Sequence, residues 1–303
     1  MSKKIQKDQK AADYSQFEVR EADELLKFLL KVLSNKGGNA VKSMLTRGQV
    51  LIDGRSETKY NYPLKPGQIV KILTNKSAKR QAELFGVTIL YEDKDIIVIE
   101  KEAGLLSIAT AKEKERTALH QLINYVKKED PRNRVFIVHR LDRETSGVMV
   151  FARSEEMKQK LQSHWDTAVK ERGYVALVEG KLSKQEGTVT SWLKETKSQL
   201  MYSSHRENDG LFAKTSYGLL QGNEEFSLLE VQLHTGRKNQ IRVHMNDLEH
   251  PIVGDKKYGA KGRNVINRLG LHARRLSFQH PRTGQLLTFE ADIPAAFLQK
   301  SRG

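Results

Sequence analysis

The sequence predicts an α+β protein, with a mixed, largely antiparallel β-sheet domain behind a small module of helices and strands. Three observations lead to this prediction. From about residue 84 onward, apolar runs of strand length follow one another at hairpin-like spacing. Few helical patterns separate them, so regular β–α–β alternation is absent. Before that point the pattern is different, with two helix-length stretches followed by two strands.

The N-terminal module is predicted over residues 17–75. Residues 21–34 place leucine, phenylalanine and valine along a helical stripe, with acidic residues in the first turn. Gly37 and Gly38 end this helix, and a second, shorter helix is expected over residues 39–46. Strands are then expected over residues 47–55, which contain an Asp-Gly turn, and over residues 66–75.

The large domain is predicted over residues 85–300. A flexible basic arm over residues 1–16 precedes the first module, and a polar linker over residues 76–84 separates the two domains. Within the large domain, strands are expected at 87–93, 95–101, 134–140, 147–153, 173–180, 227–235 and 285–293, and helices at 117–128 and 154–169.

The charge balance indicates a nucleic-acid partner. The chain has 52 lysine and arginine residues against 37 aspartate and glutamate residues, a net charge of +15 over 303 residues. Such an excess neutralises phosphates and releases their counterions, although a basic protein without such a partner is the alternative. The chain has no cysteine, which fits a reducing cytoplasm. We expect no secretory signal and no membrane association, because no apolar run is long enough.

The stretch HRLDRETSG, residues 139–147, places Asp142 in a loop between two predicted strands. Arg140 and Arg143 flank this carboxylate, so it is expected to stay ionised at neutral pH, which suits a nucleophile. A surface turn in which Asp142 pairs with its neighbours explains the stretch equally well.

Two further stretches of the large domain have polar residues at strand ends. Tyr174 begins an apolar strand, a position that is also common for a tyrosine at the boundary of a core. In HTGRKNQIRVHM, residues 234–245, the alternation predicts a strand that carries Gln240 and Arg242 on one face. Arg242 is suited to bind a carboxylate or a phosphate.

Several chemistries have no support in the sequence. Histidines 244, 250, 272 and 280 have neither a cysteine partner nor the HxxxH spacing of a metal site, so no metal is expected. Phosphate-cradling P-loops, GxGxxG dinucleotide motifs and GxSxG elbows are absent as well. We therefore expect no cofactor, and in particular no nucleotide.

The motifs HRLDRETSG, TGRKNQIRVH, GDKKYG and LHA, in this order and with Tyr174 between the first two, resemble the RluA-type pseudouridine synthases. The resemblance covers about residues 85–297. It implies an enzyme that detaches uracil from its ribose, rotates it and rejoins it through ring carbon five. One position departs from the family pattern, because Asn239 stands where many members have histidine.

The resemblance also implies roles for individual residues. Asp142 matches the catalytic carboxylate, Tyr174 the tyrosine that stacks on the target base, and Arg242 the arginine that pairs with the carboxylate. Thr145, Ser146 and Gly147 match positions that fix the shape of the loop. The substrate-binding positions that the resemblance implies are Arg140, which enters the helix stack, and Leu271, Ile241, Arg237 and His139.

The N-terminal module is similar to the S4-like RNA-binding module, with RGQVLIDGR, residues 47–55, as the strongest match. The resemblance implies RNA-binding positions at Lys42, Arg47 and Arg55, and the same combination of modules occurs in the ribosomal-RNA branch of the family. It therefore implies a monomeric enzyme that acts on large-subunit ribosomal RNA. Alternatives are a transfer-RNA enzyme, a ribosome assembly factor without catalysis, or a glycoside hydrolase with Glu144 as its second carboxylate.

Overall fold

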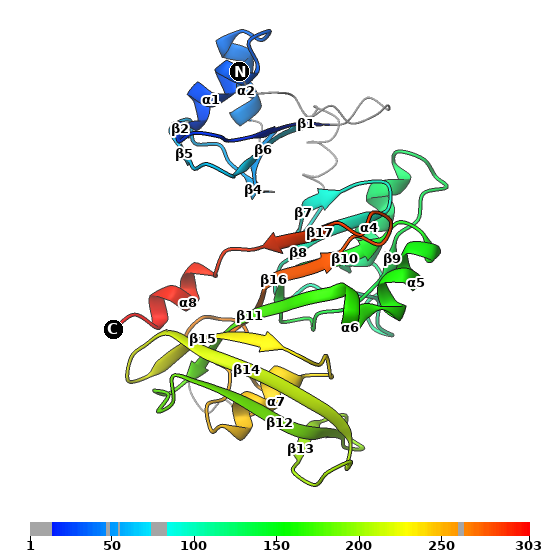
Figure 1. Cartoon of the computed structure of the whole chain (residues 1–303), viewed down its shortest axis with the longest axis vertical. Coiled ribbons are helices and arrows are strands. Elements are labelled where there is room, and N and C mark those ends of the chain that lie inside the picture. Colours follow the sequence, from blue (N-terminus) through cyan, green and yellow to red (C-terminus); the bar gives the residue numbers. More distant parts are fainter. Residues whose placement is uncertain (1–13, 47–48, 54, 74–83, 260–263) are drawn as a thin grey trace. The chain divides into compact units, whose positions relative to one another are not determined.

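The computed structural model describes residues 14–46, 49–53, 55–73, 84–259 and 264–303. Most of residues 1–16 and 76–84, the predicted arm and linker, lies outside these ranges. The chain divides into an N-terminal unit, residues 1–92, and a C-terminal unit, residues 93–303 (Figure 1). In the described part of the chain, no helix combines the length and apolar character needed to cross a membrane.

The N-terminal unit contains a helix pair and a small sheet. Its four-stranded sheet has the order β1-β6-β3-β4, and β2 pairs separately with β5. Its core contains leucines from both helices and valines from β3 and β6. The elements are β1 (Tyr14–Glu18), β2 (Asp23–Glu24), α1 (Leu25–Val32), α2 (Gly38–Thr46), β3 (Val50–Ile52), β4 (Arg55–Ser56), β5 (Pro63–Leu64), β6 (Ile69–Leu73) and β7 (Val87–Glu92).

The sequence predicted both helices and the regions of β3 and β6, but not all of their limits, and it did not predict β2 or β5. The first helix begins at Leu25 and not at residue 21, because Asp23 pairs with Leu64 as a strand. The strand predicted over residues 47–55 reverses at Asp53, whose φ is 49°, and returns as β4. Strand β1 had not been predicted: it pairs antiparallel with β6 and includes the last residues of the predicted arm.

The C-terminal unit is organised around one mixed, largely antiparallel sheet, as predicted. The strand order is β13-β12-β14-β15-β11-β16-β10-β8-β7, with β17 beside β16 and β9 beside β10; the edge strand β7 is the last element before residue 93. Strands β10 and β16 pair in parallel. The elements after β7 are β8 (Ile96–Lys101), α4 (Ala118–Lys127), β9 (Phe136–Ile137), β10 (Ser146–Ala152), α5 (Glu155–Ser163), α6 (Trp165–Ala168), β11 (Val169–Glu179), β12 (Glu186–Glu195), β13 (Met201–Ser204), β14 (Leu211–Gly222), β15 (Phe226–Leu233), α7 (Gln240–Asp247), β16 (Leu271–Gln279), β17 (Leu286–Glu290) and α8 (Ala295–Lys300).

The prediction of a strand around Arg242 was wrong, because Gln240–Asp247 forms helix α7, which lies against β13 and β14 (Figure 1). Ile241 and Met245 pack into one hydrophobic cluster, and Val243 packs into another. Since apolar side chains are buried on more than one side of this helix, its sequence shows the alternation of a strand.

Four strands of the C-terminal unit, β12, β13, β14 and β16, were missed. On β12 and β14 the inward positions include Ser191 and Thr215, both fully buried. Their hydroxyls contact the two ring nitrogens of His244, at 3.0 Å and 2.8 Å. The polar residues therefore belong to the core, and they hide the apolar alternation that marks a strand.

Two other elements differ from the prediction. The buried strand expected over residues 134–140 is reduced to β9, which pairs only with Phe151 and Ala152 of β10. The helix expected over residues 154–169 is divided into α5 and α6 at His164, whose ψ of 23° departs from helical geometry.

His244 makes the stability of the C-terminal unit dependent on pH. Burial lowers the pKa of its imidazole to about 4. This pKa is below that of a histidine in the unfolded chain. The contribution of the neutral His244 side chain to the stability of the fold is therefore complete above about pH 6.5 and is lost as the pH falls towards 4. We expect the free energy of unfolding to fall by about 2 kcal/mol between pH 7 and pH 5 through this group.

Urea unfolding followed by tryptophan fluorescence measures this effect, since Trp165 and Trp192 both lie in the C-terminal unit. His244→Gln is expected to reduce the pH dependence, whereas His205→Gln, at an exposed histidine, is expected to leave it unchanged. An equal pH dependence in the wild type and the His244 variant would contradict the assignment.

Candidate active site

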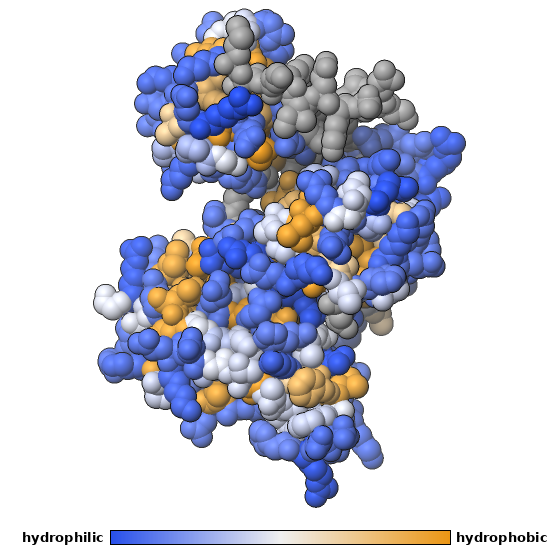
Figure 2. All heavy atoms as spheres, viewed as in Figure 1, coloured by the Kyte–Doolittle hydropathy of each residue, from blue (hydrophilic) through white to orange (hydrophobic). Residues whose placement is uncertain are grey.

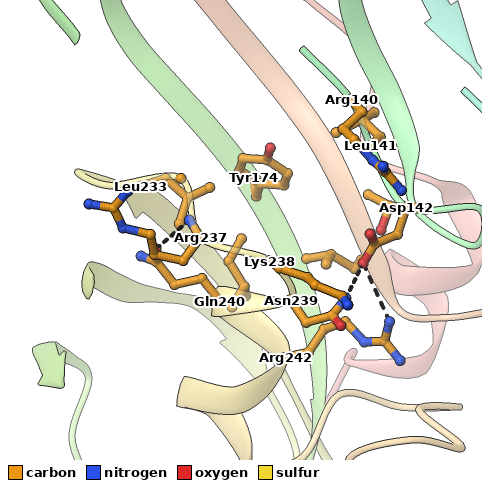
Figure 3. Close-up of a pocket in the computed structure, with 14 residues that line it drawn as sticks. Arg140, Leu141, Asp142, Tyr174, Leu233, Arg237, Lys238, Asn239, Gln240 and Arg242 are labelled. Atoms are coloured by element: carbon orange, nitrogen blue, oxygen red, sulfur yellow. Dashed lines mark hydrogen bonds and ion pairs between the residues drawn. The ribbon is translucent and has the colours of Figure 1, made fainter. Parts of the chain in front are cut away.

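One cavity of about 400 Å³ in the C-terminal unit brings together motifs that are far apart in the sequence. The cavity lies between the loop that precedes β10, strand β11 and the start of α7 (Figure 3). Seven of the eight predicted catalytic and substrate-binding residues line it: Arg140, Asp142, Tyr174, Arg237, Ile241, Arg242 and Leu271.

His139 is the eighth, and it does not line this cavity. Its Nε2 accepts a hydrogen bond from the backbone N–H of Val150, and its ring lies 4.8 Å from that of Trp165. Burial, followed by the positive charge of Arg172, lowers the pKa of His139 to about 4. A neutral imidazole in this position joins β9 to β10 and is not part of the pocket around Asp142.

The backbone on both sides of Asp142 is held by the last residue of β8 and by the segment that follows this strand. Ser107 Oγ donates to the carbonyl of Leu141 at 2.7 Å and accepts its N–H at 3.3 Å. On the other side, Lys101 Nζ donates to the carbonyl of Arg143 at 3.1 Å. The position of Asp142 is therefore fixed through the peptide groups next to it.

Lys101 is fully buried and also donates to the carbonyls of Glu102 and Leu105. Burial lowers its pKa to about 8, although the charges of Glu144 and Asp142 act in the opposite direction. The sequence prediction missed both Lys101 and Ser107. Their signal was weak, since Lys101 ends an apolar strand as many surface lysines do.

The carboxylate of Asp142 is one-third exposed and is held on one side only. Asn239 Nδ2 donates to Oδ2 at 2.5 Å, and Arg242 Nη1 lies 3.4 Å from the same oxygen (Figure 3). Among the described residues, Oδ1 has no hydrogen-bond partner. One oxygen is thus anchored while the other is available to a substrate.

Arg242 is anchored to a second carboxylate, Asp255, which is fully buried. Its Nε and Nη2 donate to the two Asp255 oxygens, each at 2.7 Å. Burial lowers the pKa of Arg242, but the hydrogen bonds and charge of Asp255 outweigh it, and the pKa lies above its usual value. This bidentate pair holds a permanent positive charge beside Asp142.

Asp255 and Tyr258 were noticed only as part of the GDKKYG motif and received no role from sequence.

The flanking arginines Arg140 and Arg143 were the expected charge partners of Asp142, and this expectation was wrong. Arg143 Nε donates to the carbonyl of Gly104 and lies 3.6 Å from Glu144. Arg140 is exposed at the rim of the cavity (Figure 3).

Tyr174 lies on β11 and is half-buried at the cavity wall. Burial raises the pKa of its phenol to about 12, and Asp142 acts in the same direction while Arg172 opposes it. The phenol is therefore protonated at neutral pH. Tyr174 is thus better suited to present its ring face to a substrate than to accept a proton.

The start of α7 is held by Gln240, which is buried and fully hydrogen-bonded. Its Oε1 accepts from Thr235 and from the backbone N–H of Arg237, and its Nε2 donates to Lys214 and Thr215 of β14. This network fixes the loop that carries Arg237 and Asn239.

The last residue of the HRLDRETSG stretch, Gly147, is a glycine for a steric reason. Gly147 has a φ of 119°, and a Cβ there would lie 2.1 Å from the carbonyl oxygen of Ala273 on β16. Ser146 contacts His272 Nδ1 at 2.7 Å and accepts from Arg268. These residues join the loop that carries Asp142 to β16, as the predicted loop-fixing role requires.

Within the described ranges, one group of three side chains has the spacing of a metal site: Asp93, Asp95 and His280. It is not part of the cavity. Both oxygens of Asp95 accept hydrogen bonds from Arg282, and His280 Nε2 contacts Asp93 at 3.0 Å. Asp95 is thus paired with Arg282, and Asp93 and His280 contact each other.

Of the three predicted RNA-binding residues of the N-terminal unit, Lys42 and Arg55 lie within the described residues. Lys42 is exposed on α2, and Arg55 begins β4. Arg47 lies outside the described residues. Figure 2 shows that the surface in this view is mostly hydrophilic, with hydrophobic side chains in small patches.

Comparison with known proteins identifies the family of the chain. The family model described as RNA pseudouridylate synthase matches residues 95–247. The RNA pseudouridine synthase YlyB of Bacillus subtilis is 32% identical over 287 residues, which cover 93% of this chain and 94% of the relative. The chain belongs to the RluA family of RNA pseudouridine synthases.

The similarity of this synthase to known proteins includes the fold of a solved structure. Human RNA Pseudouridylate Synthase Domain Containing 4 has 25% sequence identity and a TM-score of 0.59, over 74% of this chain and 94% of that chain. Ribosomal large subunit pseudouridine synthase D of Nitrosomonas europaea is 33% identical over 250 residues, 78% of this chain and 72% of the relative. The family model does not include the N-terminal unit.

Proposed function

We propose that this synthase isomerises a uridine in structured RNA in the cytoplasm, with Asp142 as the catalytic carboxylate. The observation that carries the proposal is the one-sided environment of Asp142, in which Asn239 and Arg242 hold Oδ2. Oδ1 is available at the wall of a cavity lined by Tyr174 and Leu271. A fixed ionised carboxylate with one available oxygen suits attack on the ribose, and it also suits deprotonation of the ribose.

The reaction itself is balanced without a further reactant. The bond between C1′ and N1 breaks, the uracil rotates, and a bond between C1′ and C5 forms. The proton on C5 leaves and N1 gains one, so the product is an isomer of the substrate. Asp142 is the carboxylate that this chemistry asks of the protein.

The side chains that form the walls of the cavity are suited to bind a flat base. Tyr174 offers a ring face, on which base stacking is worth roughly 1–3 kcal/mol. Ile241 and Leu271 are almost fully buried and close the apolar side. A stacked uridine hides its glycosidic bond, so the base has to leave the helix at a cost of a few kcal/mol. In this proposal Arg140, which is exposed and lines the cavity, occupies the vacated position.

A glycoside hydrolase receives no support from the pocket. Its second carboxylate would be Glu144, which is half-exposed, lies near Arg143 and does not line the cavity. Asp255 is the other nearby carboxylate, and it is paired with Arg242.

We further propose large-subunit ribosomal RNA as the substrate. The support is the name of the Nitrosomonas europaea relative, together with the N-terminal unit, in which Lys42 of α2 is exposed. Transfer RNA and a non-catalytic role in ribosome assembly are the rival proposals.

Transcripts labelled with tritium at C5 of uridine separate these proposals, because isomerisation releases that hydrogen to water. We expect the purified enzyme to release tritium from fragments of large-subunit ribosomal RNA and not from transfer RNA. Release from transfer RNA alone would overturn the substrate, and stable binding to ribosomal RNA without release from either would favour an assembly factor.

A further inference from the structure

Asn239 occupies a backbone position that restricts which residues it accepts. It precedes α7 with φ 55° and ψ 19°, in the left-handed region. Apart from glycine, the residues enriched in this region are asparagine, aspartate and histidine. Asparagine, which stands here in place of the family histidine, is therefore a residue that this backbone conformation accepts and that can donate a hydrogen bond.

A directional chain of hydrogen bonds reaches Asp142 through Asn239. The backbone N–H of Met201 donates to the hydroxyl of Tyr258 at 3.0 Å, and that hydroxyl donates to Asn239 Oδ1 at 3.0 Å. Since a backbone N–H only donates, the hydroxyl accepts there and has its own proton for Asn239. The amide oxygen is then occupied, and the amide nitrogen points to Asp142.

Tyr258 also supports the second group that contacts Asp142. The guanidinium of Arg242 lies over its ring, 5.0 Å from the centroid. The tyrosine is almost fully buried, and burial raises the pKa of its hydroxyl. It therefore remains a donor across the neutral pH range. Lys257 Nζ, at 3.5 Å, is a longer second donor to Asn239 Oδ1.

We propose that Asn239 and Tyr258 are positioning residues, which hold Oδ2 of Asp142 so that Oδ1 faces the target ribose. The inference rests on the proposed catalytic role of Asp142. In this scheme Tyr258 sets the orientation of the Asn239 amide, and Asn239 sets the orientation of the carboxylate.

A purely structural role for Asn239, as the residue that starts α7, makes a different prediction. Asn239→Gly keeps the left-handed backbone and removes only the side chain. If Asn239 served the helix alone, this variant would have the wild-type rate. As a positioning residue, its loss is expected to lower single-turnover tritium release by roughly 10–100-fold, while the Kd for RNA stays within about twofold.

Two substitutions at the same position extend the test. Asn239→His is tolerated by the backbone and restores a donor, so its rate is expected to return to within about fivefold of the wild type. Asn239→Asp has the size of asparagine but places a second carboxylate beside Asp142, and it is expected to be at least as slow as the glycine variant.

Tyr258→Phe keeps the ring beside Arg242 and removes the hydroxyl, and we expect a rate about 3–10-fold lower than the wild type. In the Asn239→Gly background it is expected to have no further effect, because the hydroxyl then has no amide to orient. Wild-type rates in both single variants, or independent effects in the double variant, would overturn the inference.

Asp142→Asn in the same assay separates this inference from the proposed function. If Asp142→Asn keeps its rate, the catalytic role of Asp142 fails, and the inference fails with it. If Asp142→Asn is inactive while Asn239→Gly and Tyr258→Phe have the wild-type rate, only the positioning role fails.

Discussion

Asp142→Asn is expected to lower tritium release by at least ~1,000-fold, as the loss of a central catalytic group does in other enzymes. The substitution removes the charge and keeps the shape of the side chain. The amide that replaces the carboxylate would still have an oxygen to accept the hydrogen bond of Asn239, so the loop is expected to keep its conformation. The Kd for RNA, measured by filter binding, is therefore expected to change by no more than a few-fold.

Glu144→Gln is the matched control, since it removes a carboxylate from the same loop, two residues away and outside the cavity. Its rate is expected to equal that of the wild type. Equal losses in the Asp142 and Glu144 variants would point to a general effect of loop charge and would contradict the assignment.

Arg242→Met is expected to have the second largest effect, because it acts on both catalysis and stability. It removes the charge beside Asp142 and leaves the buried carboxylate of Asp255 without its partner. An unpaired buried charge typically costs about 3–5 kcal/mol, and we expect a loss of stability of that size in urea unfolding. Tritium release under conditions in which the variant is folded is expected to fall at least ~100-fold.

The double variant with Arg242→Met and Asp255→Asn separates the two effects. The second substitution makes the buried side chain neutral and keeps an oxygen for the backbone N–H groups of Lys257 and Tyr258. Most of the lost stability is therefore expected to return, while the rate remains low. Recovery of the rate together with stability would show that Arg242 serves the fold and not the carboxylate.

The fold class was predictable because the apolar strands of the sheet are continuous in sequence. Strand β10 is buried along its whole length, between β8 and the parallel strand β16, and its sequence is correspondingly apolar. Strands β12 and β14 were not predictable in the same way, since Ser191 and Thr215 face the core in order to bind His244. Helix α7 was misassigned because its buried residues lie on several sides.

Most of the residues that line the cavity together were named from the sequence, but the contacts between them were not predictable. Asp142, Tyr174 and Arg242 stood in motifs, and the structure brings them to one cavity. The partner of Arg242 is Asp255, which is close in sequence but had no recognisable role without the fold. Lys101 and Ser107 act through backbone carbonyls, and such contacts have no sequence signature.

The most direct test of the central claim maps pseudouridines in cells that lack the gene and carry either the wild-type or the Asp142→Asn chain. Carbodiimide modification followed by primer extension detects each pseudouridine as a stop. The account predicts that at least one stop in large-subunit ribosomal RNA disappears without the gene, returns with the wild-type chain and stays absent with Asp142→Asn. Return of the stop with Asp142→Asn, or no change in any RNA on loss of the gene, would contradict it.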